Sequence, residues 1–324
     1  MKIQFNLTTS IEDMKRFDTR EDLLDLMNGF DGVELMQFED DKRGIIPKDR
    51  VIGLHMGYFP YWIDFWNGNL EAVRKEFDTL EAAYQYYGGS DRSAIITRYR
   101  KDLEYAHHWG AEYVVFHVSE ATIAETFHLK YRHTDEEMID AAIELLNELF
   151  AEEDGSIALL MENLWQPGLT FLRPEMTQCL MDGVKYPNKG IMLDTGHLLH
   201  TNLKLRTQEE GLAYIHSLLD MHGDLCRYIR GMHLNQSLTG EYMEQTMLNP
   251  PDLSGSYADR IGKMFWHAFA VDKHLPFTCE GIDALVERVS PEYLTFEFIT
   301  ADSTQHRQYL DAQRHALKSI LTGL

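Results

Sequence analysis

Short apolar segments rich in β-branched and aromatic residues alternate along the chain with longer amphipathic segments. Eight short segments predict strands, over residues 2–7, 32–36, 51–55, 113–118, 157–162, 190–194, 229–234 and 293–298. Between them, apolar residues recur at helical spacing, most clearly over residues 19–30, 98–110, 134–150 and 207–223. The segment "TDEEMIDAAIELLNELF", for example, opens with a threonine cap and an acidic first turn.

This alternation predicts the fold class. Continuous apolar strands separated by helices indicate a parallel sheet that is covered on both faces. Eight such units without a Pro/Gly/Ser-rich linker predict a (β/α)8 TIM barrel in the α/β class, with residues 1–324 as a single domain. A doubly wound open sheet is the alternative arrangement of the same units.

Two connections are longer than a barrel requires, over residues 56–90 and 235–272. Both follow the carboxyl end of a predicted strand, where barrels keep their active sites, so we expect loop insertions at that face. The first contains "MGYFPYWIDFWNGNL", which is dense in aromatic residues. It is either a lid that stacks on a substrate or a small hydrophobic satellite packed against the barrel.

Composition narrows the classes of partner. Hydrophobic residues make up 44% of the chain, enough for a substantial core, and 52 acidic against 30 basic residues give a formal charge of −22. This charge disfavours DNA, although bound divalent cations can reverse the field locally. The three widely spaced cysteines predict a reduced, cytoplasmic setting. An early charged amino terminus and the lack of an apolar run near 18 residues predict neither a signal peptide nor a membrane span.

The ends of six consecutive predicted strands carry residues that can bind metal. These are His55, His117, Glu162, Asp194, His233 and Glu297. A single histidine at a strand end is more often a hydrogen-bonded structural residue, but in a barrel these six ends converge on one mouth. Crowded carboxylates need a compensating cation to stay ionised, and mixed imidazole and carboxylate ligands suit Zn, Mn, Fe or Co. The pattern therefore predicts a metal site at the barrel mouth.

The segment "IMLDTGHLLH" adds a further candidate ligand. Asp194 ends an apolar strand, and the turn "TG" places His197 three residues later on the same cavity. A DxxH pair is weak evidence alone, but here it lies between Glu162 and His233 in strand order.

At these residues the sequence resembles the xylose isomerase-like barrel superfamily (AP endonuclease family 2), and its ligand pattern is most similar to that of endonuclease IV. The matching stretches are "ENLWQPG", "LDTGH", "MHLNQS", "DKH" and the final "YLTFEF". The resemblance implies up to three zinc ions. His55, His117 and Glu162 would hold the first, and Glu162 would bridge to a second shared with Asp194, His233 and Glu297. The third ion would be held by His197, Asp272 and His274.

The resemblance also implies that Tyr58, three residues after His55, contacts substrate. Arg173, after "ENLWQPGLTFL", is a further substrate-binding candidate. The "DKH" assignment spans a longer gap after His233 than the family usually shows, so Asp259 and His267 compete with it. The region "MQFEDDKRGIIPKDR" carries three consecutive acids where the family uses a basic DNA-gripping loop, and "FDGVELMQF" resembles strand two of sugar isomerases and epimerases instead.

Three functions follow. The favoured one is phosphoester hydrolysis at a multinuclear zinc site, on a small phosphorylated or sugar-like substrate. The second is a sugar or sugar phosphate isomerase or epimerase that uses one Mn, Co or Mg ion, with Glu162 and Glu297 moving the substrate proton. The third is a noncatalytic binding barrel. The remaining five ligand candidates favour hydrolysis, since an isomerase has little need of them. The sequence leaves the oligomeric state open.

Overall fold

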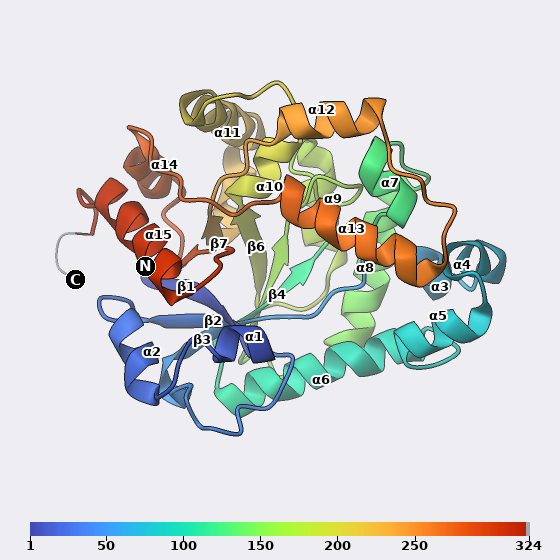
Figure 1. Ribbon diagram of the computed structural model, residues 1–324, viewed down its shortest axis with the longest axis horizontal. Helices are drawn as coiled ribbons and strands as arrows, with labels where there is room; N and C mark the ends of the chain where they lie inside the picture. Colours follow the sequence, from blue (N-terminus) through green and yellow to red (C-terminus); the bar gives the residue numbers. More distant parts are fainter. Residues whose placement is uncertain (322–324) are drawn as a thin grey trace.

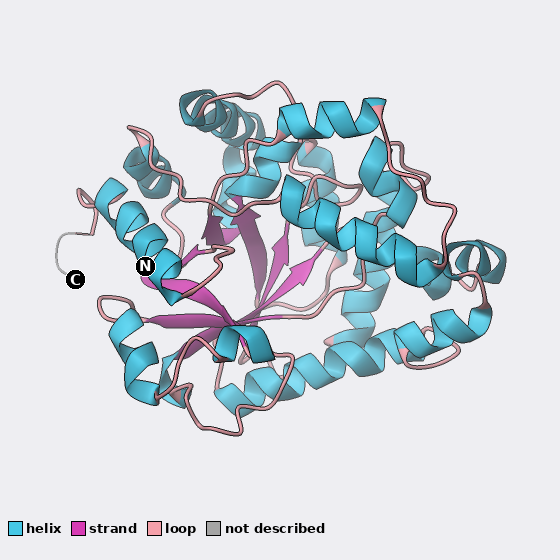
Figure 2. Cartoon of the chain, viewed as in Figure 1, coloured by secondary structure: helices cyan, strands magenta, loops and turns pink. Residues whose placement is uncertain are grey.

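The computed structural model describes residues 1–321 and shows a closed barrel of eight parallel strands in sequence order. Figures 1 and 2 show the strands as a central ring with helices around it. The TIM barrel prediction is confirmed and the open-sheet alternative is wrong, because β1 pairs with β8. The strands are β1 (Lys2–Thr8), β2 (Gly32–Met36), β3 (Val51–His55), β4 (Tyr113–His117), β5 (Ala158–Glu162), β6 (Lys189–Asp194), β7 (Ile229–Leu234) and β8 (Tyr293–Phe296).

The helices occupy the connections between the strands. They are α1 (Ile11–Met14), α2 (Arg20–Leu26), α3 (Ile63–Trp66), α4 (Leu70–Phe77), α5 (Leu80–Tyr87), α6 (Ser93–Trp109), α7 (Ile123–His128), α8 (Asp135–Leu149), α9 (Pro174–Gly183), α10 (Thr195–His200), α11 (Gln208–His222), α12 (Gly240–Leu248), α13 (Tyr257–Val271), α14 (Ile282–Val289) and α15 (Ser303–Ala316). Two short 3-10 helices, Lys48–Arg50 and Gly223–Tyr228, precede β3 and β7. Within residues 1–321, no helix is both long enough and apolar enough to cross a membrane.

Helix starts follow the capping signals of the sequence. Thr134 and Thr207 each accept a hydrogen bond from the third helical residue, whose glutamate side chain bonds back to the threonine backbone. These reciprocal bonds satisfy backbone N–H groups that have no partner within the helix. The predicted starts of α8 and α11 are thereby confirmed.

The barrel interior is built in layers of alternate residues. In β4, Tyr113, Val115 and His117 share one face because side chains of a strand alternate with period two. Near the amino-terminal end of the barrel, a buried cluster contains Tyr113 and Tyr293 together with aliphatic side chains of β3, β4, β5 and β6. The polar residues that end the strands form the opposite, carboxyl-terminal layer. Because side chains alternate along each strand, the residues at the strand ends lie on the interior face of the barrel, at its mouth.

The insertion at residues 56–90 forms α3, α4 and α5. Tyr61, Trp62, Phe65 and Trp66 are buried in the main hydrophobic core, and Phe65 stacks on Tyr87 with ring centroids 3.9 Å apart. These four side chains are packed against the barrel, as the second alternative predicts, but they join the main core instead of forming a separate cluster. Tyr58 differs, because its side chain is 48% exposed.

The insertion at residues 235–272 forms α12 and α13, which lie beside α7 in Figure 1. Met264 of α13 packs with Ile123 and Phe127 of α7 in a separate hydrophobic cluster. His267 adds a contact of 3.0 Å between its Nε2 and the carbonyl oxygen of Thr126. The helix ends at Val271, so Asp272 begins the return to the barrel.

The last strand is shorter than the predicted 293–298 and ends at Phe296. Beyond it, the backbone N–H and carbonyl of Phe298 bond to the side-chain amide of Asn6 instead of a neighbouring strand. Glu297 consequently lies just past the strand end, where its side chain reaches the mouth.

Candidate metal centre

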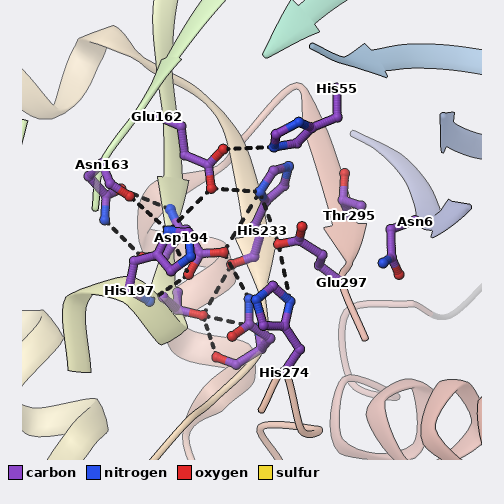
Figure 3. Close-up of polar contacts among 12 residues, drawn as sticks. Asn6, His55, Glu162, Asn163, Asp194, His197, His233, His274, Thr295 and Glu297 are labelled. Carbon is purple, nitrogen blue, oxygen red and sulfur yellow. Dashed lines mark hydrogen bonds and ion pairs between the residues drawn. The ribbon is translucent and has the colours of Figure 1, made fainter. Parts of the chain in front are cut away.

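All nine predicted ligands meet at the carboxyl-terminal mouth of the barrel, as Figure 3 shows for most of them. They form three groups in which the ligand atoms lie within 4.8 Å of one another. The groups are His55, His117 and Glu162; Glu162, Asp194, His233 and Glu297; and His197, Asp272 and His274. These are the three sets that the sequence resemblance implies.

Glu162 joins the first group to the second. Its Oε2 lies 3.2 Å from His55 Nε2 and 3.1 Å from His117 Nε2. Its Oε1 lies 3.2 Å from His233 Nδ1. Glu162 ends β5 and is fully buried, so both oxygens face the cavity side chains rather than solvent.

The second group centres on His233. Its Nδ1 lies 3.1 Å from Glu297 Oε2 and 3.7 Å from Asp194 Oδ2. Asp194 is held in place by Asn235, whose Nδ2 donates to Asp194 Oδ2 at 2.9 Å. Gly196 makes this contact possible, because a Cβ there would lie 1.9 Å from Asn235 Oδ1.

The third group places Asp272 between two histidines. Asp272 Oδ2 lies 3.1 Å from His197 Nε2 and 2.7 Å from His274 Nε2. The competing residues are engaged elsewhere. Asp259 caps the start of α13 through Ser256, and His267 contacts Thr126 and Tyr242.

The charged side chains in this pocket shift one another's pKa values. Burial alone would lower the pKa of His233, but Glu297, Glu34 and Glu162 raise it well above its usual value. Burial would likewise raise the pKa of Glu162, but His117 and His233 hold it well below the ordinary range. Burial, with the charge of Glu297, raises the pKa of the Asp194 carboxyl to about 7. The carboxylates thus depend on nearby positive charge, which protons or metal ions can supply.

The hydrogen bonds of the histidines fit a metal. His55 Nδ1 lies 2.9 Å from the Met56 carbonyl oxygen, and His197 Nδ1 lies 2.9 Å from that of Asn163. Because a carbonyl oxygen only accepts, Nδ1 carries the proton in both rings and Nε2 is left as a ligand atom. Metal-binding histidines in proteins commonly anchor their second nitrogen in this way.

Unpartnered atoms support the same conclusion. Within the described residues, His117 Nδ1 and His274 Nδ1 are buried without a hydrogen-bond partner, and Glu297 Oε2 accepts no hydrogen bond although it lies 3.1 Å from His233 Nδ1. Buried polar atoms normally have one, so these three are atoms whose bonding capacity is available to an ion or its bound water. The donor set of five imidazoles and four carboxylates matches Zn, Mn, Fe or Co rather than Ca.

The structure adds two polar residues that the sequence analysis did not single out. Glu34 of β2 is 2% exposed, and its Oε1 lies 2.9 Å from His233 Nε2. His200 of α10 is 5% exposed, and its Nε2 lies 3.3 Å from Asp272 Oδ1. A charged residue at a barrel-facing position of the apolar segment "GVELM" was the available signal for Glu34. For His200 the sequence offered only its place one turn after His197.

The predicted substrate-binding residues lie in different surroundings. Tyr58 lies over His117, with ring centroids 4.8 Å apart, at the edge of the mouth. Arg173 precedes α9 and pairs with Glu136 at 2.8 Å and with Glu175 at 2.9 Å. These carboxylates already neutralise its guanidinium. Substrate binding by Tyr58 and Arg173 stays a prediction.

Comparisons with known proteins agree with the fold. The profile of a family described as xylose isomerase-like TIM barrel matches residues 27–289. No curated protein matches the sequence. Among solved structures, a D-tagatose 3-epimerase-like protein aligns with a TM-score of 0.54 at 15% identity, covering 99% of this chain and 98% of its own.

Two further structures align over similar lengths. An IolI protein with a binding zinc atom gives a TM-score of 0.54 at 16% identity, covering 99% of this chain and 98% of its own. A probable 3-DHS dehydratase, AsbF from Bacillus anthracis, gives 0.51 at 15% identity, covering 97% and 98%. At these identities the likeness extends to the fold.

Proposed function

The chain belongs to the xylose isomerase-like TIM barrel family, and from this premise we propose that it is a metal-dependent hydrolase of phosphoester bonds. The observation that carries the proposal is the meeting of three ligand groups at one mouth, two of them joined by Glu162. A single-ion enzyme needs only one such group. Nine candidate ligands in three groups would suit phosphoester chemistry, in which several charged oxygens must be stabilised together.

Each of the three ligand groups would hold one zinc ion. His55, His117 and Glu162 would hold a first zinc ion, and Glu162 with Asp194, His233 and Glu297 a second. His197, Asp272 and His274 would hold a third. Ions so held supply Lewis acidity and neutralise charge on the phosphoester oxygens. Glu162 would remain an ionised bridge, since His117 and His233 keep its pKa well below the ordinary range.

We infer a small phosphorylated or sugar-like substrate rather than DNA. The chain has a formal charge of −22, which repels polyanions at long range. Tyr58, half exposed over His117, offers an aromatic face to a substrate at the mouth.

A sugar isomerase or epimerase is the second candidate. The group of Glu162, Asp194, His233 and Glu297 is by itself a complete set for one Mn, Co or Mg ion. Glu162 and Glu297 both approach His233 Nδ1, at 3.2 and 3.1 Å, and could act as a proton-transferring pair.

Metal analysis separates these functions. The protein is purified without chelator and its bound metals are measured by mass spectrometry. About three zinc ions per chain support the hydrolase, whereas one exchangeable Mn or Co ion supports the isomerase. A chain that binds no divalent ion contradicts both. A panel of generic phosphomonoesters, phosphodiesters and ketoses then tests the reaction class.

A further inference from the structure

Glu34 is a buried carboxylate one layer below the candidate metal ligands. It lies on β2, pairs in register with Asn6 of β1 and Gly53 of β3, and is 2% exposed. Its Oε1 and Oε2 lie 2.9 Å and 3.1 Å from the same atom, Nε2 of His233. A carboxyl group at this depth is costly to bury unless its oxygens have hydrogen-bond partners.

Two hydroxyl groups also donate to the Glu34 carboxylate. Tyr113 donates from its phenol to Glu34 Oε2 at 2.5 Å, and Thr295 donates from Oγ1 to the same oxygen at 3.2 Å. Burial raises the pKa of Tyr113 well above its usual value, so its phenol remains a donor. Gly53 leaves room for this arrangement, because a Cβ there would lie 2.1 Å from the Tyr113 ring.

These contacts decide which nitrogen of His233 faces the second ligand group. Both carboxylate oxygens of Glu34 face Nε2 of His233, and a carboxylate oxygen accepts, so Nε2 carries the proton that points to Glu34. The opposite nitrogen, Nδ1, is the atom near Glu162, Asp194 and Glu297. The ring orientation and the site of its proton are thereby both set from below the metal layer.

The partner of His233 also differs in charge from those of the other anchored histidines. His55 and His197 donate hydrogen bonds from Nδ1 to uncharged backbone carbonyl oxygens. A carboxylate partner makes the imidazole a more basic ligand than a carbonyl does. The second group therefore combines a more basic histidine ligand than His55 or His197 with three carboxylates.

We propose that Glu34 is a positioning residue that orients His233 and strengthens its Nδ1 as a ligand in the second group. The inference rests on the proposed metal centre. It assigns to the contact between Glu34 and His233 the role of making this group the tightest of the three for a divalent ion.

The test compares zinc binding by wild type, Glu34→Gln and Tyr113→Phe. Glutamine keeps the volume of Glu34 but removes its charge. Its side-chain amide also places an N–H group opposite Tyr113 or His233, each of which is itself a donor to Glu34. Tyr113→Phe removes one donor to Glu34 and keeps the ring and the His233 contact. Each protein is loaded with zinc and titrated with a competing fluorescent chelator, and circular dichroism checks the fold.

In Glu34→Gln, we expect the affinity for the tightest ion to fall about 10- to 100-fold, with the other two changed less than about threefold. In Tyr113→Phe, all three affinities should stay within about threefold of wild type. A folded Glu34→Gln protein that matches wild type overturns the inference while leaving the metal centre intact. Wild type that binds no zinc contradicts the proposed function itself.

A second measurement needs no variant. In zinc-loaded wild type labelled with nitrogen-15 histidine, His233 should carry its proton on Nε2. A proton on Nδ1 overturns the inference, even if Glu34→Gln does not fold.

Discussion

Asp272 and His200 meet at 3.3 Å, between Oδ1 of the carboxylate and Nε2 of the ring. Ser237 Oγ donates to the same oxygen at 3.1 Å. The other oxygen, Oδ2, faces His197 and His274. The two oxygens of Asp272 therefore have different roles. Oδ1 binds the residues that fix the position of the carboxylate, and Oδ2 belongs to the third ligand group.

His200→Leu should weaken the third group, because Asp272 loses one of the two contacts that fix its Oδ1. We expect about a tenfold loss of affinity for one of the three ions in a zinc titration. His200→Gln can still donate a hydrogen bond to Asp272 and should keep most of the wild-type affinity for this ion. Equal losses in the two variants would mean that packing against Trp165, at 4.6 Å between ring centroids, matters instead.

Glu162→Gln should remove more metal than loss of a ligand confined to one group, because Glu162 belongs to two groups. We expect bound zinc to fall from about three ions per chain to about one, and any metal-dependent activity to fall more than about 100-fold. His274→Ala serves as the matched variant and should lose about one ion. Equal stoichiometry in the two variants would argue against a shared carboxylate.

Gly196→Ala should displace Asn235 and free the carboxylate of Asp194. A Cβ at this position would lie 1.9 Å from Asn235 Oδ1, and the lost buried contact costs about 1–3 kcal/mol. Gly262→Ala in α13 is the control, because its Cβ meets nothing within 4 Å. It should stabilise the protein by about 0.5–1 kcal/mol. Denaturant unfolding measures both changes, and two changes of the same sign would contradict this account.

His306 should make the protein sensitive to acid. Both ring nitrogens are buried without a hydrogen-bond partner in the described structure, and the ring packs edge-on against Phe5 at 5.1 Å. Burial, with the charges of Arg16 and Arg307, lowers the pKa of His306 from 6.5 to about 3. Between about pH 6.5 and pH 3, the unfolded chain therefore binds a proton at His306 that the native state does not bind. The stability contribution is complete above about pH 6.5 and is lost as the pH falls toward about 3.

Replacing His306 with leucine should remove this dependence. Between pH 6 and pH 4, the wild-type free energy of unfolding should fall by up to about 1.4 kcal/mol per pH unit more than that of His306→Leu. His315→Leu, at an exposed position of the same helix α15, is the control and should follow wild type. Parallel pH profiles for wild type and His306→Leu would exclude this effect.

Much of this protein is determined by local sequence. The strands, the caps at Thr134 and Thr207 and the period-two alternation in β4 depend on neighbouring residues, so they can be predicted without tertiary contacts. The positions of the ligand residues at strand ends follow in the same way, because parallel strands of a barrel share one mouth.

Tertiary structure decided what each of these residues contacts. Glu34 lies 199 positions from His233 in the sequence, and Asp272 lies 72 positions from His200. No local pattern encodes such pairs, because strand alternation sets only the direction of a side chain and not its partner. The burial of Tyr61 and Trp62 likewise depends on distant contacts, since Tyr61 packs against Phe77 with ring centroids 6.1 Å apart and Trp62 Nε1 donates to the carbonyl oxygen of Ser119 at 3.3 Å. Periodicity thus determines which side chains face the mouth, whereas close packing in three dimensions determines which of them touch.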